Sequence, residues 1–228
     1  MSKFSALLLD LDGTLLDTAP DMGAALNRLR VEHGRHALPQ DRIRPIVSHG
    51  AARLVKLGFP EADAEEFERL RRRFLELYSQ NLAEHSRLFP DLDPLLAGLE
   101  RRGMPWGIVT NKPGWLTDPL LASLGIDLRA SCVVSGDTVA ERKPHPLPLL
   151  HAASLIGVEP ARCVYVGDAE RDIQAGRAAG MFTVVAAYGY ISDEDDPQSW
   201  QAAAIAREPA EIGAWLHGWP APPAGDGA

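Results

Sequence analysis

Residues 103–186 alternate between short apolar segments and longer segments that end at a glycine. The apolar segments suit strands buried on both faces, and the longer segments have the length of helices. The predicted strands lie at residues 105–110, 130–135, 162–166 and 182–186. The glycines that would end the helices are Gly125, Gly157 and Gly180. This alternation is typical of an α/β domain with a parallel sheet and right-handed crossovers.

The rest of the chain fits around this domain. Residues 4–9 are another apolar segment, too short to stand alone and therefore expected in the same sheet. Residues 202–206 are expected to form a last edge strand, and residues 209–216 a closing helix. From residue 17 to about residue 87 the pattern is helical, with a long amphipathic stretch at 61–85 and no convincing strand. Shorter helices are expected at residues 40–48, 51–57 and 195–201.

The fold class is therefore predicted to be α/β, with a Rossmann-like parallel-sheet core and an inserted small α-helical cap domain. Residues 1–16 and 89–217 would form the core, and residues 17–88 the cap. Residues 218–228 are rich in proline, glycine and alanine, and we expect them to form a disordered tail.

The composition limits the class of function. A net charge of −8 over 228 residues argues against a nucleic-acid partner, because nothing would neutralise many backbone phosphates. Cys132 and Cys163 lie in apolar segments, which indicates buried thiols in a reducing compartment. No signal peptide or membrane-spanning run is visible. We therefore expect a cytoplasmic monomer or homodimer with no membrane partner.

An acidic motif follows the first apolar segment. Asp10 and Asp12 stand two positions apart where the strand ends, and Gly13 and Thr14 follow. Open α/β sheets place ligand crevices at this end of their strands. An ordinary acidic turn is the alternative interpretation, since Asp-Gly is common in turns. Two carboxylates that repel each other and resist burial are better explained if a cation and an electrophile bind there.

Polar residues also follow the other predicted strands. Thr110 and Asn111 end the second, Lys143 follows the third, and Asp168 ends the fourth, with Asp172 one helical turn later. A turn, a surface lysine and a helix-dipole partner are the respective alternatives. Several carboxylates near oxygen-rich loops suit Mg²⁺. No zinc-ligand spacing and no nucleotide-cradling glycine loop is present in the sequence.

Together these segments resemble the four motifs of the haloacid dehalogenase (HAD) superfamily of phosphatases. The motifs occur in that family's order, and they are Asp10-Leu11-Asp12-Gly13-Thr14, Thr110-Asn111, Lys143-Pro144 and Gly167-Asp168 with Asp172. A helical insertion after the first motif resembles the small α-helical cap subclass typified by phosphoglycolate phosphatases. The resemblance implies a HAD-like fold and a Mg²⁺-dependent phosphomonoester hydrolase.

The resemblance also implies roles for the charged residues. Asp10 would attack phosphorus to form an aspartyl-phosphate, and Asp12 would protonate the leaving group and then deprotonate water. Asp10, Asp168 and the backbone carbonyl of Asp12 would hold Mg²⁺. Lys143 would offset the charge on the transferring oxygens, and Asp172 would orient Lys143 or a metal-bound water. The proton-shuttling role expected of Asp12 belongs to phosphate-ester chemistry and argues against dehalogenation.

The substrate-binding residues are less strongly indicated. Thr14, Thr110 and Asn111 would contact the phosphoryl oxygens. In the cap, Arg53 follows Ser48-His49-Gly50 and could place a cation over a small-molecule phosphate ester. A solvent-facing Arg53 at an ordinary joint between two helices is the alternative interpretation.

The substrate itself has several candidates. Residues 108–113 and 187–191 resemble the N-acetylmuramic acid 6-phosphate phosphatases of peptidoglycan recycling, so this ester is predicted first. 2-Phosphoglycolate is the main alternative, and both compounds carry a carboxylate beside the phosphate. A mutase similar to β-phosphoglucomutase and a non-enzymatic binding protein are the alternatives from other classes.

Overall fold

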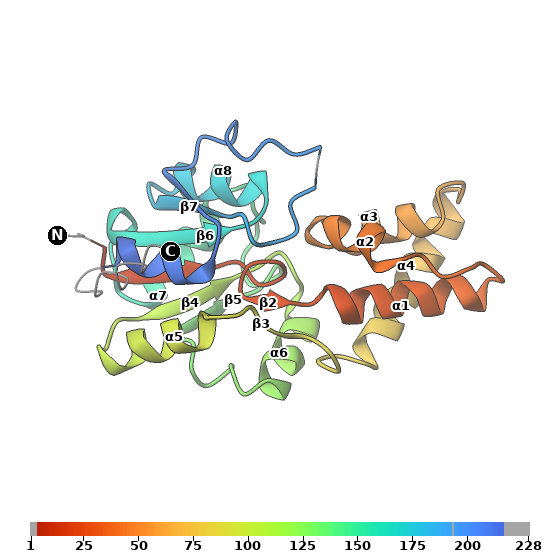
Figure 1. The fold of residues 1–228 in the computed structure, drawn as a ribbon, viewed down its shortest axis with the longest axis horizontal. Coiled ribbons are helices and arrows are strands. Elements are labelled where there is room, and N and C mark those ends of the chain that lie inside the picture. The colour runs from red at the N-terminus through yellow and green to blue at the C-terminus, as the bar shows by residue number, and fades with distance from the viewer. Residues whose placement is uncertain (1–3, 193, 217–228) are drawn as a thin grey trace, which may run out of the picture.

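A six-stranded parallel sheet forms the centre of the larger half of the molecule (Figure 1). The computed structural model describes residues 4–192 and 194–216. The strand order is β5-β4-β1-β6-β7-β8, and every neighbouring pair is parallel. The strands are β1 (Ala6–Leu9), β4 (Trp106–Val109), β5 (Cys132–Val134), β6 (Cys163–Gly167), β7 (Phe182–Ala186) and β8 (Ala204–Ala206). The predicted parallel sheet, including its edge strand near residues 202–206, is confirmed.

Strand β1 is apolar throughout because helices cover both faces of the sheet. Leu7 and Leu9 belong to one apolar cluster, and Ala6 and Leu8 belong to another. The first cluster includes side chains of α5 (Leu92–Arg101) and α6 (Gly114–Ser123). The second includes side chains of α7 (Leu147–Leu155) and α8 (Glu170–Ala178). Successive side chains of a strand point to opposite faces, so a strand between two layers of helices has no polar side.

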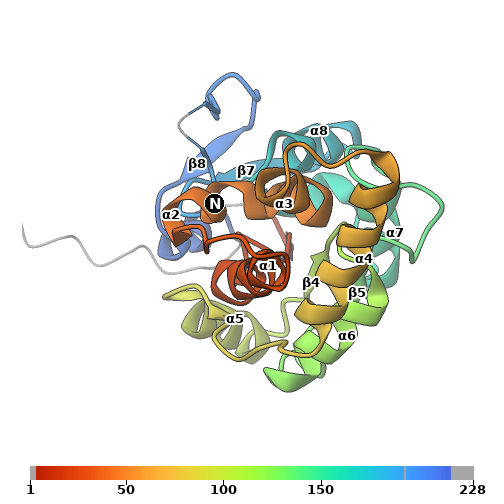
Figure 2. The same ribbon diagram turned by 90° about the vertical axis from the view of Figure 1, so that its right-hand side faces the viewer.

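The helical insertion packs as a separate group beyond the carboxyl ends of the strands, as Figure 2 shows from that end. Its elements are α1 (Ala19–Glu32), α2 (Gln40–Ile43), the 3₁₀ helix η1 (Arg44–His49), α3 (Gly50–Gly58) and α4 (Ala64–Ser79). The amphipathic α4 places Leu70, Phe74 and Leu77 against the apolar side of α1. Its first turn is capped by Asp63, whose carboxylate accepts a hydrogen bond from the Glu66 amide at 2.9 Å.

A two-stranded antiparallel ribbon connects the insertion to the sheet. Strand β2 (Leu16–Asp17) pairs with β3 (Arg87–Leu88), so the expectation of no strand between residues 17 and 87 was wrong. Strands of two residues are too short to show an alternating pattern, which explains the omission. The boundary at residues 16/17 falls within β2 and the one at 88/89 falls directly after β3, and both remain our proposal for the division into core and cap.

Some predicted helices differ from those in the structure. Helix α4 ends at Ser79 rather than at residue 85, and Ala83 lies beyond it in a left-handed conformation with φ of 61°. The segment expected as one helix at 40–48 changes from α2 to η1 near Pro45, which lacks the amide needed to continue an α-helix. Residues 195–201 form turns instead of a helix.

The carboxyl-terminal segment ends in a 3₁₀ helix, η3 (Pro209–Trp215), rather than an α-helix. The predicted tail at residues 218–228 lies outside the described residues. Within the part of the chain that the structure describes, no helix has the length and apolarity needed to span a membrane.

The close approach of β4 to β5 at Gly107 gives a stability prediction. A β-carbon at residue 107 would overlap the Cys132 sulfur and lie 3.0 Å from the Cys132 carbonyl oxygen. We expect Gly107→Ala to lower the free energy of unfolding by about 1–3 kcal/mol, measured by urea denaturation. Leu128→Ala, at a side chain that is 93% exposed, should change it by less than about 0.5 kcal/mol.

The double variant Gly107→Ala/Cys132→Ala separates this overlap from a general loss of strand stability. It should be more stable than the sum of the two single changes predicts, because the small side chain removes the sulfur that the new methyl group meets. Strict additivity of the two changes would contradict the assigned cause.

Candidate active site

The predicted motif residues meet at the end of the sheet that faces the helical insertion (Figure 1). Asp10 follows β1, Thr110 follows β4, and Asp168 follows β6. Because β1 lies between β4 and β6, these three strand ends are direct neighbours. The parallel topology therefore brings together side chains that are far apart in the sequence.

Lys143 is the centre of the most buried part of the site. Its ammonium lies 2.7 Å from a carboxylate oxygen of Asp10 and 2.7 Å from one of Asp172. It also donates hydrogen bonds to the Val109 carbonyl at 2.8 Å and the Tyr165 hydroxyl at 2.9 Å. The Lys143 and Asp172 side chains are fully buried and that of Asp10 is 5% exposed, so these ion pairs are shielded from solvent.

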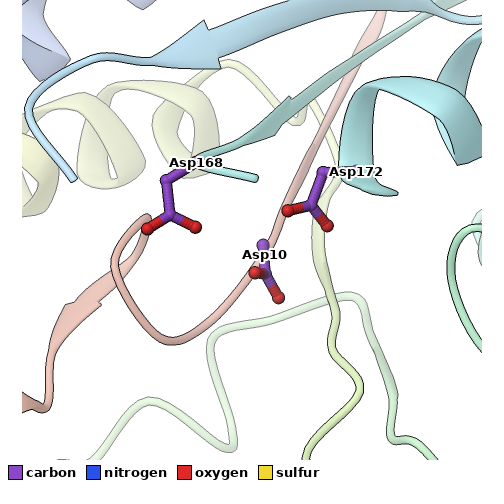
Figure 3. Close-up of side chains that lie close together, drawn as sticks. All are labelled: Asp10, Asp168 and Asp172. Carbon is purple, nitrogen blue, oxygen red and sulfur yellow. The ribbon is translucent and has the colours of Figure 1, made fainter. Parts of the chain in front are cut away.

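One carboxylate oxygen of Asp168 accepts hydrogen bonds, and the other accepts none from the described residues. Its Oδ2 accepts hydrogen bonds from the Ser48 hydroxyl at 2.6 Å and from the Tyr190 amide at 2.9 Å. Its Oδ1 is buried and has no hydrogen-bond partner among the described residues. Figure 3 shows the carboxylates of Asp168, Asp10 and Asp172 converging, and one oxygen from each lies within 4.8 Å of the others.

This cluster suits a hard divalent cation. Carboxylate oxygens are the ligands that Mg²⁺ and similar cations prefer, and an unpaired buried carboxylate oxygen is costly without one. Asp172 is less available as a ligand, because its two oxygens already accept hydrogen bonds from Tyr165 and the Ala169 amide. The Ser48 hydroxyl also lies 3.5 Å from the Asp12 carbonyl oxygen, so that carbonyl is close to Asp168.

Burial and mutual repulsion shift the proton affinities of these acids. Burial raises the pKa of Asp168 to about 7, and the nearby Asp10 and Asp172 add to the effect. Burial also raises the pKa of Asp10, against the opposing attraction of Lys143. Burial also acts to raise the pKa of Asp172. The neighbouring cations Lys143 and Arg171 nevertheless hold that pKa below its usual value. Without a bound cation, the group therefore favours retaining a proton near neutral pH.

Asp12 has a separate cation of its own. Its Oδ1 lies 2.7 Å from the Lys112 ammonium and accepts a hydrogen bond from the Thr18 hydroxyl at 2.6 Å. The Lys112 ammonium also lies 4.9 Å from the ring centre of Tyr78 on α4. Lys112 directly follows the second motif, but it was not among the predicted site residues. Only the fold shows that its side chain reaches Asp12.

The three predicted phosphate-binding residues differ in their hydrogen-bond partners and in whether they line the cavity. Thr110 is buried, lines the cavity described below and accepts a hydrogen bond from the Lys112 amide at 3.1 Å. Asn111 also lines it, but its side-chain amide is paired with the backbone N–H and C=O of Lys143 at 3.0 and 2.9 Å. The Thr14 hydroxyl is buried with no hydrogen-bond partner among the described residues. Their contacts with substrate remain predictions.

A cavity of about 630 Å³ lies between the insertion and the sheet. Asp10 and Asp12 line it, as do four cationic side chains from both halves of the molecule. These cations are Arg71, Lys112, Arg142 and Arg171. Arg53 is exposed and does not line this cavity, and its proposed contact with substrate remains a prediction. With Asp137, the lining holds three carboxylates against these four cations, and the remaining positive charge suits an anionic ligand.

Comparison with known proteins agrees with the motifs. Residues 7–186 match the family profile described as haloacid dehalogenase-like hydrolase. A phosphoglycolate phosphatase of Xanthomonas campestris pv. campestris is 47% identical over 218 residues, which cover 95% of this chain and 98% of the relative. An N-acetylmuramic acid 6-phosphate phosphatase of Pseudomonas aeruginosa is 42% identical over 211 residues, covering 92% and 93%.

The solved structures show the same architecture. A protein from Haemophilus somnus, described as a predicted phosphoglycolate phosphatase, superposes with a TM-score of 0.82 at 29% identity. The superposition covers 93% of this chain and 97% of that protein. The six-stranded sheet with its helical insertion is therefore shared over nearly the full length of both chains.

The raised proton affinities predict how stability depends on pH. Asp168 binds a proton in the folded chain at pH values where the unfolded chain, with a pKa near 3.8, has already released it. Its contribution to stability is therefore complete below about pH 3.8 and is lost as the pH rises through about 7. In the absence of divalent cations, we expect the melting temperature of the parental protein to fall between about pH 5 and pH 8 more steeply than that of Asp168→Asn.

Magnesium should reverse this loss. Because protons and a cation compete for the same oxygens, added Mg²⁺ should raise the melting temperature more at pH 8 than at pH 5, as measured by differential scanning calorimetry. An equal effect at both pH values, or the same effect in Asp168→Asn, would contradict the assignment of these acids as the cation site.

Proposed function

Because the chain belongs to the haloacid dehalogenase-like hydrolase family, we propose that it is a magnesium-dependent phosphatase in which Asp10 takes up the phosphoryl group of a phosphate monoester. The observation that carries this proposal is the position of Asp10. Its carboxylate lines the cavity and lies 2.7 Å from the buried Lys143 ammonium. A nucleophile, a cation and room for an anionic ester therefore coincide at one strand end.

The proposed reaction has two steps. In the first, a bond forms between an Asp10 oxygen and phosphorus while the bond from phosphorus to the ester oxygen breaks. Asp12 donates a proton to the leaving oxygen. In the second step Asp12 takes a proton from a water whose oxygen bonds to phosphorus, while the bond from phosphorus to the Asp10 oxygen breaks and inorganic phosphate is released. Lys143 offsets the negative charge on the transferring oxygens, and its contact with Asp172 keeps it beside Asp10.

Magnesium would be held by Asp10, Asp168 and the backbone carbonyl of Asp12. The free buried oxygen of Asp168 fits this ligand set, as does the closeness of the Asp12 carbonyl to Asp168. When bound, the cation supplies positive charge that reduces the repulsion between a carboxylate and a phosphate dianion.

The preferred substrate is proposed from two observations that point in different directions. The higher identity to phosphoglycolate phosphatases favours 2-phosphoglycolate, and this revises the order expected from the sequence. The size of the cavity instead favours N-acetylmuramic acid 6-phosphate as a second candidate, since a two-carbon acid fills a small part of 630 Å³. Both esters carry a carboxylate, which suits the positively charged lining.

Phosphate release from a panel of esters would test the function and rank its substrates. The panel contains 2-phosphoglycolate, N-acetylmuramic acid 6-phosphate and common sugar phosphates, each with Mg²⁺ and with a chelator. We expect release only with the cation, and the larger kcat/KM identifies the preferred carboxylate ester. The absence of release from every ester would refute the proposed function.

Replacing the nucleophile should abolish the reaction without unfolding the protein. We expect Asp10→Asn to lower kcat by at least about 10³-fold, because an amide cannot form the acyl-phosphate. Acid quenching followed by mass spectrometry should detect one added phosphoryl group on the parental chain and none on Asp10→Asn. Asp127→Asn, at an exposed aspartate outside the cavity, should match the parental rate. An Asp10→Asn protein with the parental rate would disprove the mechanism.

Lys112 should affect turnover through the position of Asp12. Without the ammonium that holds one Asp12 oxygen, we expect Lys112→Met to lower kcat by about 10- to 100-fold, because small displacements of a reacting group have effects of that size. Lys112→Arg, which keeps a donor near Asp12, should retain more activity than Lys112→Met. Steady-state kinetics with Mg²⁺ measures both. Equal rates for parental protein and Lys112→Met would show that Asp12 needs no such support.

A further inference from the structure

Trp115 is an exposed aromatic side chain on the lining of the cavity. Its residue is 53% exposed, although tryptophan usually buries much of its large apolar surface. The other exposed large apolar residues of the described chain are Val31, Leu128, Leu150 and Leu155, and none of them lines this cavity. An apolar surface left open beside a binding site is the kind that a ligand covers.

The backbone around Trp115 is held firmly, so the indole is presented from a fixed base. The preceding Gly114 amide donates a hydrogen bond to Asp137 at 2.8 Å, and the Leu116 amide donates one to the Pro113 carbonyl at 3.0 Å. The next two side chains, Leu116 and Thr117, are buried in the core. Trp115 stands in the first turn of α6, and Lys112, Pro113 and Gly114 separate it from the second motif.

The cavity lining near the insertion has matching chemistry. Met22, Val47, Leu75 and Tyr78 give the insertion's side of the cavity an apolar and aromatic character. Arg71 of α4 adds a guanidinium, which in this structure is paired with the Glu68 carboxylate at 2.8 Å. An ester with its phosphate beside Asp10 would have its organic part next to a lining with both apolar surface and a cation. Such a lining suits a ring with an attached acidic group better than a short chain.

We propose that Trp115 determines specificity by packing its indole against the organic part of sugar-sized phosphate esters. The inference rests on the proposed phosphatase function and deepens it, because it assigns a substrate class to the same site. A two-carbon ester has no ring surface to pack against the exposed indole, whereas an ester with a six-membered ring has one. Trp115 touches the substrate but takes no part in bond formation, so it acts on binding rather than on the chemical step.

The test compares two esters with three variants. N-Acetylmuramic acid 6-phosphate and 2-phosphoglycolate are assayed with the parental protein, Trp115→Ala and Trp115→Phe, and Leu128→Ala serves as an exposed apolar control outside the cavity. We expect Trp115→Ala to raise KM for the ring-bearing ester by about 10-fold, with kcat nearly unchanged. KM for 2-phosphoglycolate should stay within about twofold. Trp115→Phe should restore most of the lost affinity.

The remaining outcomes separate this inference from the proposed function. Equal changes in KM for both esters, or no change for the ring-bearing ester, would overturn the role of Trp115 while phosphate release still supports the phosphatase. A fall in kcat for both esters would show that Trp115 supports the fold of the site instead. No phosphate release by the parental protein from either ester would overturn the proposed function, and this inference with it.

Discussion

The site depends on one buried ammonium between two carboxylates. Lys143 lies 2.7 Å from both Asp10 and Asp172, and no solvent reaches its side chain. A buried charge without a partner is strongly destabilising, so the three groups must be positioned together. Asn111 contributes by pairing its amide with the Lys143 backbone, which fixes where the long side chain begins. Backbone groups also hold each of the three: the Val109 carbonyl accepts from Lys143, the Ala169 amide donates to Asp172, and the Asp10 amide donates to the Val166 carbonyl.

The parts of this arrangement that local sequence encodes could be predicted. The strands around Leu8, Ile108 and Val166 are predicted by short apolar runs. Their parallel direction is predicted by the helices that connect them along the chain. Once the strands are aligned, Asp10 and Asp168 must be neighbours, because their strands are adjacent in the sheet. The predicted α/β core with a helical insertion was therefore confirmed.

The contacts that the sequence did not reveal join residues that no local pattern connects. Lys112 meets Asp12 across 100 positions, and Ser48 meets Asp168 across 120. Tyr165, whose hydroxyl donates a hydrogen bond to the buried Asp172, stands within an apolar strand, where an aromatic residue signals only packing. Arg53 was selected for its charge, but the direction of its side chain depends on how α3 packs. Such choices require tertiary geometry.

Asp168 connects the cation site to the position of the insertion. Its Oδ2 is held by Ser48, which belongs to the insertion, and by the backbone amide of Tyr190, which belongs to the sheet domain. The Tyr190 hydroxyl donates to Asp17 at 2.6 Å and accepts from the Ala19 amide at 2.9 Å, at the entry to the insertion. Any displacement of the insertion therefore removes a hydrogen bond from the same carboxylate that is proposed to bind the cation. The orientation of that carboxylate therefore depends on where the insertion sits relative to the sheet, because the Ser48 and Asp17 contacts join the two.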